Sequence, residues 1–317
     1  NTTTSGDVSI GGSTGIDLGA SSVAGALSVT ATTGNITDSG ALTISGTSAF
    51  TTSADHGTIT LNTTTNAFTG AVTLTTNDAD GAVASATIDG GTTALVIAAS
   101  TVDGDLTLTS GHTSGITDSG TLTIGGNLSA TTDAGNGVVD LGTLAVDGTV
   151  ALTTHGSGDA TVVNDAALTF AASSVAGALS ATATTGNIID NATVTVGGNF
   201  AVTATADDAT VNLGTLAVDG TVALTTNGSS GNVTVVNDAG LAFAASTVDG
   251  TLSATATTGD ISDSGAQTIL GAATYITSAT GSDIILDHTS NTYAAGVTFK
   301  ADDGTETFGD LTFVDTG

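Results

Sequence analysis

Hydrophobic and polar positions alternate along the chain in short runs of three to five residues. Residues 121–142 show the pattern, with apolar residues at Leu122 and Ile124, Leu128 and Ala130, and Val139 and Leu141. Valine and threonine fill the runs, and glycine, asparagine and aspartate separate them, as is typical of short strands joined by turns. No i, i+3, i+4, i+7 spacing persists for three helical turns. The pattern predicts an all-β chain.

One sequence repeat of about 22 residues, which we call a line, occurs about a dozen times, and such recurrence is typical of a repeat architecture. In its frame an apolar residue is followed by any residue, a glycine, any residue, and then two alternating inward positions. The frame glycines are Gly25, Gly46, Gly70, Gly104, Gly126, Gly148, Gly177, Gly198, Gly220, Gly250 and Gly271. We interpret them as structural glycines of the repeat.

A line of about 22 residues holds three short strands and three turns, which is the size of one coil of a parallel β-helix. We therefore predict a parallel β-solenoid of about 12 coils, stacked at the interstrand spacing of about 4.8 Å. The alternative is a string of β-sandwiches, one for each longer repeat. The 22-residue sub-period disfavours sandwiches, whose strands seldom repeat one motif three times.

Three lines form a super-repeat, because Val102, Val175 and Val248 follow one another at intervals of 73 residues. Every third line is longer and carries a further apolar triplet, at 95–97, 168–170 and 241–243. We expect an added strand or flap at these triplets, on one flank of the solenoid.

The repeats predict a shaft over residues 1–280, followed by a different segment. Its super-repeats lie near 23–101, 102–174, 175–247 and 248–280. Residues 281–317 are expected to hold degenerate repeats and a cap or the start of another module, since aromatic residues such as Phe308 gather near this end together with Lys300 and Glu306.

The net charge of the chain limits the kinds of partner that it can bind. The chain has 317 residues, 30 of them acidic and one of them basic, for a net charge of −29. Such a surface repels phosphate, so nucleic acid and anionic membranes are disfavoured. No apolar run approaches the roughly 20 residues of a membrane span. Cysteine is absent, which excludes thiolate metal sites and disulfides. Methionine is absent as well, which suggests that the sequence is an excerpt or a processed product.

Aspartates recur at two places in the repeat. One set stands just before the frame glycine and comprises Asp103, Asp147, Asp219 and Asp249. The other set lies in TDSG-like turns and comprises Asp38, Asp118, Asp190 and Asp263. Stacked carboxylates with turn carbonyls could hold Ca²⁺, the one cofactor that the sequence suggests. The simpler interpretation is that each carboxylate accepts backbone N–H groups of its turn.

Other polar residues are predicted to be structural. Asn164-Asp165 and Asn237-Asp238 close matching VVND segments, where we expect asparagine in a left-handed turn rather than in a ligand-facing row. The histidines occupy unlike positions without partners at fixed offsets, and so we expect exposed loop residues rather than metal ligands. They are His56, His112, His155 and His288.

Catalysis is disfavoured, and we expect no catalytic residue. A polysaccharide-cleaving β-helix needs a unique cleft with a carboxylate pair or a basic residue. This chain has no arginine or tryptophan, and it is periodic. Outward threonines suggest an ice-binding surface, which would need a uniform row of them. The first outward position after the frame glycine varies, however, with Thr73 and Thr107 in some repeats and Ser28, Ser129 and Ala151 in others.

The frame VxGxLxVTATTGNITDSGxLTIxGN, repeated over about residues 20–280, resembles the repeat regions of giant bacterial surface proteins. These are the filamentous-haemagglutinin-like adhesins and related β-strand-repeat exoproteins. The resemblance implies a right-handed parallel β-helix shaft, secretion to the cell surface, and a role in attachment, biofilm or extracellular fibres. The secretion domain characteristic of that family does not occur in this stretch.

We therefore expect a non-catalytic structural shaft of an extracellular adhesin or filament. It would associate with itself end to end or laterally, and could contact a glycan or a cell-surface receptor. The alternative is a module that binds glycan or mineral along the periodic face, and a polysaccharide-active enzyme ranks third.

Overall fold

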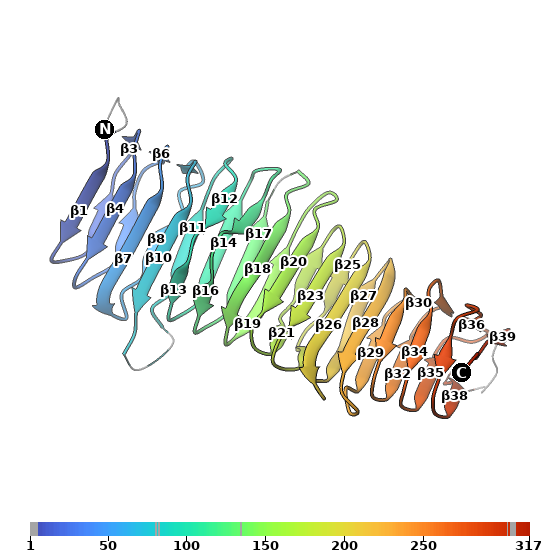
Figure 1. Cartoon of the computed structure of the whole chain (residues 1–317). Helices are drawn as coiled ribbons and strands as arrows, with labels where there is room; N and C mark the ends of the chain where they lie inside the picture. Colours follow the sequence, from blue (N-terminus) through green and yellow to red (C-terminus); the bar gives the residue numbers. More distant parts are fainter. Residues whose placement is uncertain (1–5, 80, 82, 134, 303, 305–308) are drawn as a thin grey trace. The chain divides into compact units, whose positions relative to one another are not determined.

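The computed structural model describes residues 6–79, 81, 83–133, 135–302, 304 and 309–317. These residues form a parallel β-solenoid of about 14 turns, without a helix in the described ranges. Each strand pairing whose register is known is parallel, and the strands of successive turns lie side by side (Figure 1). The predicted fold class is confirmed. The chain divides into two compact units, residues 1–164 and 165–317.

The described residues of the first unit form twenty strands. They are β1 (Val8–Gly12), β2 (Ile16–Leu18), β3 (Ser21–Val23), β4 (Leu27–Ala31), β5 (Ile36–Asp38), β6 (Leu42–Ile44), β7 (Ser48–Asp55), β8 (Ile59–Leu61), β9 (Ala67–Phe68), β10 (Val72–Asn77), β11 (Ala86–Asp89), β12 (Leu95–Ile97), β13 (Ser100–Val102), β14 (Leu106–Ser110), β15 (Ile116–Asp118), β16 (Leu122–Ile124), β17 (Leu128–Thr132), β18 (Val139–Val146), β19 (Thr149–Thr153) and β20 (Ala160–Asn164).

The other nineteen strands lie in the described part of the second unit. They are β21 (Leu168–Phe170), β22 (Ser173–Val175), β23 (Leu179–Ala183), β24 (Ile188–Asp190), β25 (Val194–Val196), β26 (Phe200–Asp207), β27 (Val211–Val218), β28 (Thr221–Asn227), β29 (Val233–Asn237), β30 (Leu241–Phe243), β31 (Ser246–Val248), β32 (Leu252–Ala256), β33 (Ile261–Asp263), β34 (Gln267–Ile269), β35 (Ala273–Thr277), β36 (Ile284–Leu286), β37 (Thr292–Tyr293), β38 (Val297–Ala301) and β39 (Leu311–Phe313).

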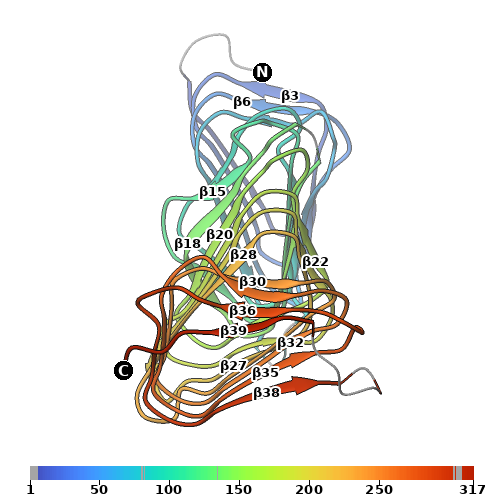
Figure 2. The same ribbon diagram turned by 90° about the vertical axis from the view of Figure 1, so that its right-hand side faces the viewer.

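A typical turn has one longer strand and two short ones. The longer strand, which we call the frame strand, follows the frame glycine, as β4 follows Gly25. The two short strands, such as β5 and β6, lie in other sheets than the frame strand of the same turn. Each turn returns over the one before it (Figure 2).

Apolar side chains, aliphatic for the most part with some aromatic rings among them, form inward columns, as the alternation predicts. In the first unit Val29 pairs with Phe50 in the next turn, and Phe50 pairs with Leu74. All three side chains are fully buried. Every second residue of a strand therefore stacks on its equivalent one turn away, and the apolar contact is renewed at each turn.

The frame glycines stack directly on one another. The N–H of Gly126 donates to the carbonyl oxygen of Gly104 at 3.0 Å, and the N–H of Gly148 donates to that of Gly126 at 3.0 Å. A Cβ on Gly126 would lie 2.7 Å from the carbonyl carbon of Gly104. None of the frame glycines has a positive φ among the described residues. Glycine is needed here because two backbones approach closely at this corner.

An added strand occurs at each longer line, but it precedes the apolar triplet that we expected to form it. The triplet strand β12 pairs with β15, and β30 pairs with β33, as ordinary short strands do. The added strands are β11 and β29, which pair with neighbours on both sides: β11 with β8 and β14, β29 with β27 and β32. β20, which ends the first unit, pairs with β18.

Each added strand is half a turn, so the frame strands exchange sheets after it. In the first unit β4, β7 and β10 share one sheet, whereas the next frame strand, β14, stacks on β11 in the sheet of β5 and β8. In the second unit β28 is followed by β30 and β31 in its own sheet, and the next frame strand, β32, stacks on β29. These half-turns help to bring the count to about 14 turns instead of the 12 expected.

The strands of residues 281–317 continue the stacking of the second unit. Val297 in β38 pairs with Ala273, and Leu311 in β39 pairs with Ile284. Aromatic rings pack inside these turns, with the Tyr275 and Phe299 rings stacked at a centroid distance of 6.0 Å. Phe308 and Glu306, which we used to mark a change of composition, lie outside the described residues.

Candidate functional site

The aspartates of the TDSG-like turns bind backbone of the following turn. Asp190 accepts hydrogen bonds from the N–H groups of Gly214 at 2.9 Å and Thr215 at 2.8 Å, and from the Thr215 hydroxyl at 2.9 Å. Asp118 accepts the same set from Gly142 and Thr143. These backbone donors lie at bulges, where the register shifts between β18 and β20 and between β27 and β29. The carboxylate thus satisfies N–H groups that the irregular strand pairing leaves over.

The other two members of this set use an asparagine partner as well. Asp38 accepts hydrogen bonds from the N–H groups of Asn62 and Thr63 and from the side-chain amide of Asn66. Asp263 does the same with Asp287, His288 and Asn291. In each unit the two turn aspartates lie in different sheets, Asp38 in that of β5 and Asp118 in that of β15. Their carboxylates therefore do not stack.

The aspartates before the frame glycine are also separate from one another. Asp103 accepts the N–H of Asp78 at 2.8 Å, while Asp147 and Asp219 are exposed. Val102 pairs with Ile124 and Ile124 with Val146, so Gly125 stands between Asp103 and Asp147. Asp249 donates its N–H to Thr226 Oγ1 at 3.2 Å. Among the described strand registers within each unit, none pairs two of the eight candidate aspartates, and the Ca²⁺ sites stay a prediction.

Asn164 and Asn237 do not have the left-handed backbone that we expected. Both are 1% exposed, and the positive φ angles outside glycine in the described ranges belong to His56 and Asp208. Asn237 Oδ1 accepts the N–H of Val218 at 2.8 Å, and its Nδ2 donates to the Val218 carbonyl at 3.0 Å. The carboxamide replaces a rung of the ladder at the bulge, which explains why a polar residue is buried there.

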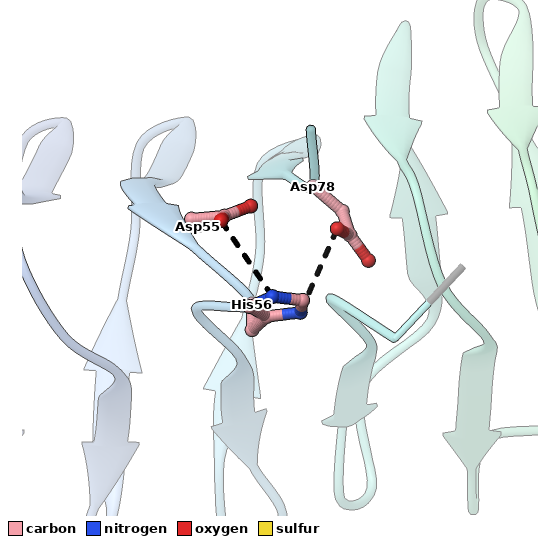
Figure 3. A group of neighbouring side chains, drawn as sticks. All are labelled: Asp55, His56 and Asp78. Carbon is pink, nitrogen blue, oxygen red and sulfur yellow. Dashed lines mark ion pairs between the residues drawn. The ribbon is translucent and has the colours of Figure 1, made fainter. Parts of the chain in front are cut away.

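Three of the four histidines bond to backbone. His112 and His288 accept N–H groups two residues further on through Nδ1, and His155 Nδ1 lies 2.6 Å from the carbonyl oxygen of Thr132. His56 differs, because two carboxylates face its imidazole ring (Figure 3). His56 is exposed, as expected, but the spacing of the histidines along the sequence did not indicate these two carboxylate neighbours.

Asp55, His56 and Asp78 form a cluster, which we call the His56 corner. Asp55 ends β7, His56 follows it with a φ of 60°, and Asp78 follows β10 one turn further on. His56 Nε2 lies 3.6 Å from Asp55 Oδ2, and His56 Nδ1 lies 3.6 Å from Asp78 Oδ1. One ligand atom from each side chain can be chosen so that all lie within 4.8 Å of one another.

The His56 corner is half open to solvent. The side chains of His56 and Asp55 are 49% and 52% exposed, whereas that of Asp78 is fully buried. Asp78 accepts the N–H groups of Gly81 at 3.1 Å and Val83 at 2.8 Å, which fix its carboxylate. A hollow of about 480 Å³ adjoins Asp55 and His56 and is also lined by Thr32, Asn35 and Ser53.

The second unit has a corresponding corner with different side chains. Asn77 pairs with Asp55 in the first unit, and Asn227 pairs with Asp207 in the second. Asp208, with a φ of 62°, therefore occupies the place of His56. Gly228 occupies the place of Asp78. Asp208 Oδ1 accepts the N–H of Ser230 at 2.8 Å, so its carboxylate has a structural role.

An uninterrupted column of threonines follows one sheet of each unit. The strand registers bring these residues together, and all of them are exposed or half-buried. The first unit contributes Thr30, Thr51, Thr75, Thr101 and Thr123. The second unit contributes Thr182, Thr203, Thr225, Thr247, Thr268 and Thr292.

Comparison of equivalent positions in the repeats does not reveal this column, because its threonines come from different positions of the repeat. As far as Thr75 in the first unit and Thr225 in the second, each threonine is the second outward residue of a frame strand. Beyond these two residues, each threonine of the column is the middle residue of a short strand. The half-turn places these different strands in register. A second hollow, of about 280 Å³, lies in the second unit beside the half-turn and is lined by Thr193, Thr215, Leu216, Val236, Asp238 and Thr257.

A family model described as repeats of unknown function (DUF5649) matches residues 5–75, 80–141, 157–208 and 230–300. Comparison with curated proteins and with solved structures found no match. Within the described ranges no helix is long and apolar enough to cross a membrane.

Proposed function

For a chain that belongs to the DUF5649 family of repeats of unknown function, we propose the role of a structural shaft in an extracellular bacterial surface adhesin or filament. In this role it spaces other segments from the cell and supports attachment, biofilm or fibre formation. We assign it no catalytic role.

The stacking of identical frame corners is the observation that carries this proposal. Backbone hydrogen bonds join Gly104, Gly126 and Gly148 across successive turns, and buried columns run beside them. Each turn contacts only its neighbours, so length can grow by repetition without enlarging the core. This is the property that a spacer needs, and it explains why the lines are so similar.

Electron microscopy of the purified chain tests the shaft. We expect unbranched rods of uniform width. Removal of one 73-residue block should shorten them by roughly 17 Å, which is 3.5 turns at about 4.8 Å per turn. Branched or globular particles, or a length that does not change with block number, would contradict the proposal.

Lateral self-association fits the threonine columns. Each column is an uncharged strip on a chain with a net charge of −29, so two copies that meet along such a strip bring fewer carboxylates together. Screening by cations, including Ca²⁺, would reduce the remaining repulsion. Sedimentation at rising salt tests this: association should increase with ionic strength, and replacement of Thr51 and Thr75 by aspartate should prevent it.

The second candidate is a module that binds glycan or mineral along the periodic face. The hollow beside the half-turn favours it, since Thr193, Thr215 and Thr257 surround an apolar floor near Asp238. Hydroxyl and carboxylate groups over apolar side chains suit a sugar ring. A glycan array decides: one strong signal that Asp238→Ala abolishes would favour this module over the shaft alone.

A further inference from the structure

We propose that the His56 corner binds one divalent transition-metal ion of the zinc class, held by one imidazole nitrogen of His56 and by carboxylate oxygens of Asp55 and Asp78. This site would link two successive turns of the first unit. It is independent of the shaft role, and it differs from the Ca²⁺ sites suggested by the repeated aspartates.

The geometry requires little rearrangement. Zinc ligands lie about 2.0–2.2 Å from the ion, so that a tetrahedral set has its atoms roughly 3.3–3.6 Å apart. The imidazole already lies 3.6 Å from an oxygen of each carboxylate. Those contacts use different ring nitrogens, and so the ring must turn until one nitrogen faces both oxygens. One ligand atom of each of the three side chains already lies within 4.8 Å of the others, and the ring, about half exposed, has to move only over this short range.

The donor set selects the class of ion. Imidazole nitrogen suits zinc, cobalt and nickel, whereas calcium and magnesium prefer oxygen ligands only. Asp78 supplies a carboxylate that is already oriented, since the N–H groups of Gly81 and Val83 hold it, and such outer contacts strengthen metal sites. The hollow beside Asp55 and His56 lets water fill the remaining coordination positions.

The repeat itself supports the assignment independently. The corner at Asp208 has the same register and a left-handed residue at the same place, which shows that the backbone turn requires neither a histidine nor an aspartate in the next turn. Asp208 is engaged with Ser230, and Gly228 carries no ligand. The two corners thus differ at two places that meet in space: an imidazole replaces the engaged Asp208 carboxylate, and the Asp78 carboxylate stands where Gly228 has no side chain.

Titration of the intact chain with Zn²⁺, and with Co²⁺ as a spectroscopic probe, tests the site. We expect one saturable equivalent, with the imidazole protons of His56 the ones most broadened by Co²⁺ in the NMR spectrum. Millimolar Ca²⁺ should not displace the ion. A titration without a saturable equivalent, or displacement by Ca²⁺ at comparable concentration, would overturn the proposal.

Variants taken from the chain's own second corner keep the test free of misfolding. His56→Asp and Asp78→Gly copy Asp208 and Gly228, and His56→Asn retains a residue that tolerates a left-handed backbone. Each should weaken Co²⁺ binding by at least about tenfold with an unchanged circular dichroism spectrum. His112→Asn is the matched control and should bind as the unaltered chain does. Equal binding by His56→Asn and the unaltered chain would refute the site, while the rods seen by microscopy would be unaffected.

Discussion

The carboxamide of Asn237 brackets the backbone of Val218. Its oxygen accepts the Val218 N–H at 2.8 Å and its nitrogen donates to the Val218 carbonyl at 3.0 Å. The same nitrogen reaches the Gly240 carbonyl at 2.6 Å. A side chain therefore completes the ladder at the bulge in β27, the point where a half-turn strand leaves its neighbour.

Asn237→Ala should destabilise the second unit by about 2 kcal/mol or more, because it leaves a buried N–H and a buried carbonyl without partners. Asn212→Ala, at an exposed position of the same strand β27, should change stability by less than about 0.5 kcal/mol. Urea unfolding followed by circular dichroism measures both. Hydrogen exchange should also become faster at the Val218 amide, and an unchanged exchange rate there would contradict the bracketing role.

Gly126→Ala should be among the most damaging single methyl additions. The new Cβ would lie 2.7 Å from the Gly104 carbonyl carbon, and backbone must move to admit it. Gly142→Ala provides the control, since a Cβ there meets nothing within 4 Å. We expect a clear drop in melting temperature for the first variant and little change for the second. Equal melting temperatures would show that the corners are not closely packed.

Ser100→Ala tests the exchange of sheets. The Ser100 hydroxyl accepts the N–H of Leu74 at 2.9 Å and donates to the Ala98 carbonyl at 2.8 Å, so it serves a donor that the two short strands leave unpaired. Loss of the hydroxyl should cost about 1–3 kcal/mol. Ser28→Ala, at an exposed position of β4, is the control. If both variants unfold at the same urea concentration, the hydroxyl is not needed at this crossing.

Alkaline pH should unfold the second unit through its tyrosine pair. The hydroxyls of Tyr275 and Tyr293 lie 3.0 Å apart in the core. Burial raises the pKa of Tyr293 to about 12 and raises that of Tyr275 well above its usual value. In the unfolded chain both phenols ionise near pH 10. The stability that they contribute is therefore complete below about pH 10 and is lost as the pH rises toward 12.

The variant Tyr275→Phe/Tyr293→Phe should remove most of this alkaline loss. The two residues are the only tyrosines of the chain, and replacing both avoids an unpaired buried hydroxyl. Free energies of unfolding at pH 8, 10, 11 and 12 provide the measurement. A pH dependence that is the same with and without the tyrosines would assign the alkaline sensitivity to other groups.

The fold followed from the sequence because each turn repeats the same burial pattern. Alternation at Leu128 and Ala130 and the recurrence of frame glycines are local signals, and each turn packs only on its neighbours. The half-turns were misplaced because β20 and β29 each end at an asparagine that is followed by an aspartate, a pair which we interpreted as a turn. Burial of Asn164 depends on a bulge in the neighbouring strand, and no local pattern reveals it.

The His56 corner was missed for a related reason. Asp78 lies 22 residues after His56, and the two meet only because the register places β10 directly on β7. The available signal was a comparison of lines: histidine replaces aspartate and aspartate replaces glycine relative to Asp208 and Gly228. A residue that differs from its counterpart in another turn of a repeat is a candidate for a role beyond folding.

Because of the half-turn, the number of 73-residue blocks decides the side of the solenoid on which later frame strands lie. A 73-residue block comprises three turns and a half, so inserting or deleting one block reverses the side toward which every later frame strand faces. Two blocks restore the original side. Recombination between near-identical blocks would thus alter orientation as well as reach, and an attached binding segment would alternate between facing toward and away from a given neighbour as odd and even numbers of blocks succeed one another.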